Sequence, residues 1–209
     1  MLAAAVRNES TISVPCLAEH YLEVIRESFR NGPFKLMGFC FGGMLAYEVA
    51  RRATAAGAKV ELLVMVDTPL WTRIPFSRSK WITHHMKGLQ EEGLTYLTGR
   101  VSKKLGLERA AASSSTSAEP NEEATARVGA LARRVRNYEP EGGYEGRALL
   151  IRADDPALFV THRESRLLGW DDFLHGRVGV EFVSGAHSEI MTQPYVSAMG
   201  RLLGGYLGN

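Results

Sequence analysis

One short stretch constrains the fold of this chain more than any other, residues 38–43, with the sequence Gly-Phe-Cys-Phe-Gly-Gly. An apolar run at 34–37 precedes it, and residues 44–56 follow with the apolar spacing of an amphipathic helix ended by a glycine. Residues 59–66 are almost continuously apolar, which is typical of a strand covered on both faces of a parallel sheet. Strand, glycine turn, helix and strand within about thirty residues predict a βαβ unit.

The same alternation returns at both ends of the chain. Residues 16–26 carry apolar positions at helical spacing, and apolar runs at 147–153 and 178–183 predict two further strands. A closing helix is expected at 194–207, with Pro194 suited to its first turn. Strands that alternate with helices predict an α/β fold with a mostly parallel sheet.

We expect residues 1–209 to form a single domain with a long insertion at 70–137. The insertion has helical character without a clear strand, and its residues 110–123 are low in complexity. Long insertions in compact α/β domains are often functional, so we predict a helical lid. The alternative is a small helical subdomain without a catalytic role.

Composition excludes several classes of protein. The 209 residues are 45% hydrophobic and 23% charged, as in an ordinary soluble protein, and a net charge of +2 predicts neither nucleic-acid nor membrane binding. No apolar run approaches the length of a membrane span or of a secretory signal. Two cysteines do not indicate a disulfide framework, and no cluster has metal-ligand spacing. We therefore expect a cytoplasmic protein without a metal.

The glycine-rich turn has the spacing of a nucleophile elbow, Gly-x-Ser-x-Gly, with Cys40 in place of the serine. A tight turn from strand to helix requires small neighbours, and it places the thiol at a helix N-terminus, where the dipole favours the thiolate. The backbone N–H of Phe41 would then face a developing oxyanion. The alternative is a tight turn with a small buried cysteine.

A thiol nucleophile needs a base, and His187 is the best candidate because it lies in a loop between the last strand and the last helix. The residue that orients this base has two possible positions. Asp67 follows the strand after the elbow, whereas Asp154 or Asp155 follows the next strand. The residues alone leave these alternatives open, since each could also be a cap or turn residue.

Several stretches together resemble the thioesterase domains of non-ribosomal peptide and polyketide synthases, which are α/β-hydrolases. They are residues 32–50 around the elbow, Tyr138-Glu139-Pro140, Tyr144-Glu145-Gly146, Gly169-Trp170 and Gly185-Ala186-His187. The resemblance implies Asp67 as the acid, a mobile lid at 70–137 and no cofactor of the protein's own. It also implies an acyl or peptidyl thioester substrate, carried on the phosphopantetheine of a carrier domain.

This chain departs from that family in two ways. Its nucleophile is a cysteine where serine is usual, and only 39 residues precede Cys40, fewer than the front strands of the fold require. The absent part normally supplies the second oxyanion donor, and we expect a fold truncated at its N-terminal side, either as a fragment of a longer polypeptide or as a shortened enzyme. The strand at 34–37 would then have a free edge open to pairing with another chain.

The sequence therefore predicts a thioesterase that releases its product by hydrolysis or cyclisation through a Cys40 acyl-enzyme. One alternative is a hydrolase of small esters or lactones, similar to dienelactone hydrolases, which would use Asp154 or Asp155 with His187. Another is a remnant that binds a carrier domain without turnover.

Overall fold

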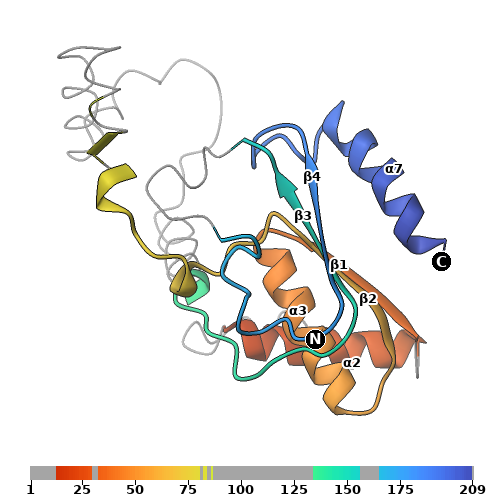
Figure 1. Ribbon diagram of the computed structural model, residues 1–209. Coiled ribbons are helices and arrows are strands. Elements are labelled where there is room, and N and C mark those ends of the chain that lie inside the picture. The colour runs from red at the N-terminus through yellow and green to blue at the C-terminus, as the bar shows by residue number, and fades with distance from the viewer. Residues whose placement is uncertain are drawn as a thin grey trace, which may run out of the picture.

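A parallel four-stranded sheet forms the centre of the protein in the computed structural model (Figure 1). The structure describes residues 13–29, 33–80, 82–83, 86, 134–155 and 165–208. The strands lie in the order of the sequence: β1 (Phe34–Phe39), β2 (Val60–Val66), β3 (Ala148–Ala153) and β4 (Val178–Val183). The predicted α/β fold with a parallel sheet is confirmed.

Helices cover both faces of this sheet (Figure 1). Two of them, α2 (Val14–Phe29) and α3 (Phe41–Ala55), lie together on one face, and α7 (Tyr195–Leu207) lies on the other. The single-turn η2 (Trp71–Arg73) follows β2. The chain passes from β1 through α3 into β2, which is the βαβ unit that the glycine-rich turn predicted.

Strand β2 is apolar throughout because it meets both layers. Leu63 and Met65 pack into the core beneath α3, whereas Leu62, Val64 and Val66 pack into the core beneath α7. This alternation follows from the two-residue period of a strand. The continuous apolar run in the sequence therefore reflects burial on two faces.

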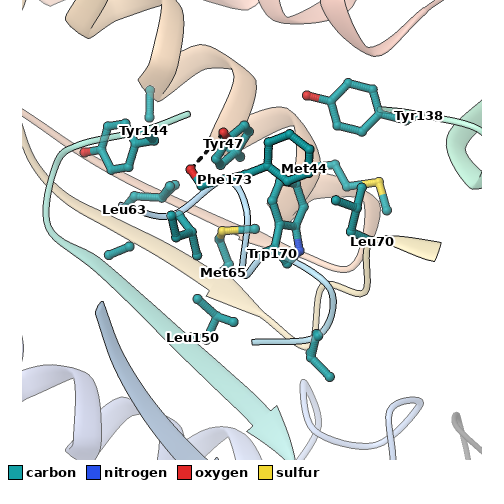
Figure 2. Close-up of a cluster of buried hydrophobic side chains, with 14 of the residues drawn as sticks. Met44, Tyr47, Leu63, Met65, Leu70, Tyr138, Tyr144, Leu150, Trp170 and Phe173 are labelled. Carbon is teal, nitrogen blue, oxygen red and sulfur yellow. Dashed lines mark hydrogen bonds between the residues drawn. The ribbon is translucent and has the colours of Figure 1, made fainter. Parts of the chain in front are cut away.

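The larger core, beneath α3, is built around aromatic side chains (Figure 2). Trp170 and Tyr47 are fully buried, with their rings 4.5 Å apart between centroids. The hydroxyl of Tyr47 donates to the carbonyl oxygens of Gly142, at 2.7 Å, and Phe173, at 3.2 Å. These bonds link the helix after the elbow to the segment that precedes β3 and to the connection between β3 and β4.

Helix α3 carries a buried carboxylate, Glu48. It accepts hydrogen bonds from Arg51, Arg52 and the hydroxyl of Tyr138. Burial by itself would raise the pKa of Glu48, but these bonds together lower it. The ion cluster therefore fastens α3 to the chain as it returns toward β3.

The element ends differ from the sequence expectations at the elbow. Strand β1 continues to Phe39 and α3 begins at Phe41, so that Cys40 alone forms the turn. Most of the predicted insertion at 70–137, including 110–123, lies outside the described residues, and its role as a lid stays a prediction. Leu70 and Ile74 within it are buried in the main core.

Strand β1 occupies one edge of the sheet, where its only strand partner among the described residues is β2. Met37, near the end of this strand, is exposed. In the parts of the chain that the structure describes, no helix has the length and apolar character needed to cross a membrane.

Candidate active site

Three of the predicted residues follow strand ends at one edge of the sheet. Cys40 follows β1, Asp67 follows β2, and His187 lies in the loop between β4 and α7. Because all four strands run parallel, their carboxyl ends meet at the same edge. The topology therefore brings these side chains together from positions far apart in the sequence.

The backbone of Cys40 has the unusual conformation of an elbow, with φ 52° and ψ −117°. Its N–H donates to the carbonyl of Val66 at 2.8 Å, and its own carbonyl accepts from the N–H of Gly43 at 3.0 Å. A non-glycine residue in this region is strained and persists only where its surroundings hold it. The elbow is held by the end of β2 and by the first turn of α3.

Glycines permit the close approach of strand and helix at this turn. A Cβ on Gly38 would overlap the backbone of Gly42, and a Cβ on Gly43 would overlap the side chain of Thr68. A Cβ on Gly42 would meet no atom within 4 Å. Gly38 and Gly43 must therefore lack a side chain for the turn to close. At Gly42 a side chain would fit, and it is the backbone of this residue that lies against Gly38.

Asp67 is buried, with 1% of its surface exposed, and both of its carboxylate oxygens are bonded. One oxygen, Oδ2, accepts from Nδ1 of His187 at 2.6 Å, and Oδ1 accepts from the N–H of Ala153 at 3.2 Å. The next residue, Thr68, is fixed by the indole N–H of Trp170, which donates to its carbonyl at 2.7 Å. The structure thus pairs His187 with the acid that the resemblance implied.

The imidazole of His187 also contacts Phe39 and faces Cys40. Its ring stacks on Phe39 at a centroid distance of 4.8 Å, and its bond through Nδ1 leaves Nε2 for the thiol of Cys40. The hydrogen bond to Asp67, and next the interaction with Cys40, outweigh partial burial and raise the pKa of His187 to about 9. This arrangement favours the protonated form of the imidazole.

The alternative acids, Asp154 and Asp155, contact the backbone of the loop after β4. The exposed carboxylate of Asp154 accepts from the N–H of Gly185 at 3.0 Å, and the N–H of Asp155 donates to the carbonyl of Gly185 at 3.3 Å. Both aspartates thus contact the loop that carries His187. The carboxylate bonded to the imidazole is that of Asp67.

Phe41, the predicted oxyanion donor, is the first residue of α3. The first N–H groups of a helix have no partner within it, so they are available to an anion near Cys40. The position agrees with the expected role, which stays a prediction.

The remaining candidates lie apart from this site. Cys16 is a free, exposed cysteine on α2, and His175 is an exposed residue bonded to Glu145. His84, His85 and His162 lie outside the described residues. Within the described ranges, no group of three or more His, Cys, Asp or Glu side chains could hold a metal ion.

Sequence reasoning missed the contacts that support the base. Phe39 gave a signal only as the residue between the first glycine and the nucleophile of the elbow. Trp170 contributed to the resemblance without any role attached to it. The bond from Gly185 to Asp154 had no signal, because it depends on how two loops meet.

Comparison with known sequences identifies the family. The thioesterase domain family matches residues 4–201, so the chain belongs to the thioesterase domain family. A non-reducing polyketide synthase of Pseudevernia furfuracea is 26% identical over 205 residues, which are 90% of this chain and 10% of the synthase. The polyketide synthase PksR of Bacillus subtilis is 42% identical over 53 residues, 25% of this chain and 2% of that protein. The chain thus spans a tenth or less of these curated relatives.

Solved structures agree on the fold. The thioesterase domain of NocB, in covalent complex with a fluorophosphonate nocardicin G analog, has a TM-score of 0.62 and 24% identity, covering 94% of this chain and 75% of that one. The thioesterase domain SrfTE, described in the cyclization of the lipopeptide antibiotic surfactin, has a TM-score of 0.57 and 16% identity. That match covers 92% of this chain and 75% of SrfTE. The parallel sheet and its helices therefore share the fold of these thioesterase domains.

The two elbow glycines provide a matched test of the turn. We expect Gly38→Ala to lower the free energy of unfolding by about 3 kcal/mol or more, because the new methyl group displaces backbone. Gly42→Ala should be neutral or stabilising by up to about 1 kcal/mol, since it adds a better helix former in open space. Urea unfolding measures both, and equal losses would contradict this account of the turn.

The raised pKa of His187 predicts how stability depends on pH. A histidine whose pKa rises from 6.5 to about 9 on folding stabilises the fold fully below about pH 6.5, and this contribution is lost as the pH rises through 9. The difference in unfolding free energy between the wild type and His187→Gln should therefore shrink between about pH 6 and about pH 9.5. A constant difference across this range would mean that the imidazole is not held by Asp67 in solution.

Proposed function

We propose that this chain is a thioesterase that releases an acyl or peptidyl chain from the phosphopantetheine of a carrier domain through a Cys40 acyl-enzyme. One observation carries the proposal, the position of His187 between a buried carboxylate and the elbow cysteine. A nucleophile, a base and a residue that orients the base are the three parts that acyl transfer needs. The chain's membership of the thioesterase family supports the same reaction.

The proposed first step forms the acyl-enzyme. In the reacting form of the site, the proton on Nε2 of His187 is the one given up by the Cys40 thiol, and the resulting sulfur anion attacks the carbonyl carbon of the substrate thioester. The N–H of Phe41 donates to the oxyanion, and a second donor would come from another group. The tetrahedral intermediate collapses as the bond to the pantetheine sulfur breaks. His187 returns its proton to that leaving thiolate.

The second step releases the product and restores the enzyme. His187 accepts a proton from water, or from a hydroxyl or amine of the acyl chain, as that group attacks the Cys40 thioester. Water gives a free acid, whereas an internal nucleophile gives a ring. The Cys40 sulfur leaves and recovers its proton from His187, so no redox partner or metal enters the cycle.

The proposed partner is a carrier domain that delivers the substrate thioester. Relatives that match most of this chain are polyketide synthases, and a shorter match is N-(5-amino-5-carboxypentanoyl)-L-cysteinyl-D-valine synthase of Penicillium rubens, 42% identical over 52 residues. One solved structure in the comparison is a four-domain nonribosomal peptide synthetase with a TM-score of 0.62. These names support a substrate built on a carrier and agree with either an acyl or a peptidyl chain.

Two other functions remain as outcomes of experiment. A hydrolase similar to dienelactone hydrolases would use Asp154 or Asp155, and the contact between Asp67 and His187 argues against it. A carrier-binding remnant without turnover would not need a reactive thiol. Faster alkylation of Cys40 than of the exposed Cys16 at neutral pH would distinguish an enzyme from such a remnant.

Substitution of the triad residues tests the proposal directly. We expect Cys40→Ala to abolish the acyl-enzyme, and His187→Ala to slow its formation by about 10²–10⁴-fold because the thiol loses its base. Asp67→Asn should cost more than Asp154→Asn or Asp155→Asn, because the Asp67 carboxylate is hydrogen-bonded to the imidazole. Intact-protein mass spectrometry after mixing with an acyl thioester measures each rate. A crippling Asp155→Asn with a harmless Asp67→Asn would reverse the assignment.

The use of sulfur favours cyclising release over plain hydrolysis. A Cys40 acyl-enzyme is itself a thioester, so it keeps the reactivity of the carrier-bound substrate, whereas a serine would give a less reactive oxoester. That reactivity helps when the product is a strained ring, such as a β-lactam or β-lactone, a macrocycle, or the product of a weak amine. We expect Cys40→Ser to keep part of the hydrolysis and to lose most of the cyclisation of a carrier-bound substrate. Equal cyclisation by both proteins, measured by mass spectrometry of products, would contradict this idea.

A further inference from the structure

Three hydrogen bonds join the end of β3 to the end of β4 and to the loop that carries His187, and two of them reach the loop itself. The N–H of Asp154 donates to the carbonyl of Val183 at 3.1 Å, which continues the ladder between β3 and β4. The Asp154 carboxylate then accepts from the N–H of Gly185 at 3.0 Å, and the N–H of Asp155 donates to the Gly185 carbonyl at 3.3 Å. Both the N–H and the carbonyl of Gly185, two residues before His187, are therefore hydrogen-bonded.

The loop has little freedom at Gly185. Its φ of 114° is a conformation that favours glycine, and a Cβ there would lie 3.1 Å from ring atoms of Tyr195 at the start of α7. The next residue, Ala186, donates its N–H to the carboxylate of Glu189 at 3.3 Å. The path from β4 to His187 thus runs between the Asp154 carboxylate and the Tyr195 ring.

We propose that Asp154 is a positioning residue, whose carboxylate latches the His187 loop to β3 so that the imidazole meets Asp67 and Cys40 together. The inference rests on the proposed function, in which His187 is the base. The bond from His187 to Asp67 is 2.6 Å long and aligns one ring nitrogen. A displacement of about 1 Å in such an arrangement can cost about 10²-fold in rate, and the single residue between Gly185 and His187 leaves little tolerance.

A latch and a catalytic acid make different demands on this position. The latch needs an oxygen that accepts the Gly185 N–H, and the amide oxygen of asparagine also accepts one. A catalytic acid needs negative charge beside the imidazole, which asparagine removes. Asp154→Asn should therefore preserve a latch and disable an acid, whereas Asp154→Ala removes both.

The experiment compares Asp154→Ala, Asp154→Asn and the control Asp171→Ala, which removes an exposed carboxylate elsewhere, all in a Cys16→Ser background. Two measurements need no thioester, the alkylation rate of Cys40 by iodoacetamide at neutral pH and the titration midpoint of His187 by NMR. We expect Asp154→Ala to slow alkylation about tenfold and to move the midpoint toward the ordinary histidine range, because the imidazole leaves Asp67 and Cys40. Asp154→Asn should stay within about twofold of the parent in alkylation, and Asp171→Ala should match the parent.

Two results would overturn the latch. Unchanged alkylation and midpoint in Asp154→Ala would mean that the loop holds its position without the carboxylate. Equal damage by Asp154→Asn and Asp154→Ala would mean that the charge matters and the bond does not. If Asp154→Ala fails to fold, Asp154→Glu replaces it, since it keeps the charge but shifts the oxygen. If the carboxylate is a latch, Asp154→Asn should keep a faster alkylation of Cys40 than Asp154→Glu. If the charge is what matters, Asp154→Glu should be the faster of the two.

These measurements also separate the latch from the proposed function. A protein that turns over no carrier-bound thioester, yet loses Cys40 reactivity in Asp154→Ala alone, would refute the thioesterase proposal and support the latch. Full thioester release by Asp154→Ala would support the thioesterase proposal and refute the latch.

Discussion

The close approach of β1 to the first turn of α3 is the constraint on which the site depends. Gly38 lies against the backbone of Gly42, so the chain reverses through a single residue, and Cys40 takes up a strained backbone. The same helical turn brings Gly43 against the side chain of Thr68, directly after the acid. Close contacts at this one turn therefore fix both Cys40 and the loop that follows Asp67.

Electrostatics then determine the protonation state of the site. Asp67 is almost without solvent, and a buried carboxylate is stable only when its oxygens are bonded. The Ala153 N–H satisfies one carboxylate oxygen and the imidazole satisfies the other. The bond to Asp67 raises the pKa of His187 well above its ordinary value. A positive charge close to a cysteine in general favours its thiolate, the reactive form, whereas a serine gains much less because an alkoxide is far harder to form.

The sequence predicted the sheet and the βαβ turn, and it singled out His187 in the loop after the last strand, because each depends on local periodicity and chain order. It could not choose between Asp67 and Asp154, since both follow adjacent parallel strands whose carboxyl ends share one edge. Strand order alone favours Asp154, because β3 neighbours β4. The loop between β4 and α7 reverses that preference by reaching across to β2, and loop paths leave no periodic signal. The burial of Glu48 was missed for a related reason, because its partner Tyr138 is 90 residues away.

The imidazole of His187, the proposed base, is supported by every strand of the described sheet. Phe39 stacks on it from β1, Asp67 bonds to it from the end of β2, and Asp154 holds its loop from the end of β3, while the loop itself leaves β4. A histidine on a loop would otherwise lose rotamer and backbone freedom at a cost of about 1–2 kcal/mol for each residue fixed. Contacts from four directions supply that order before substrate arrives, and catalysis gains from such preorganisation. The two aspartates are thus not competing versions of one role: the buried one acts on the ring and the exposed one on the backbone that carries it.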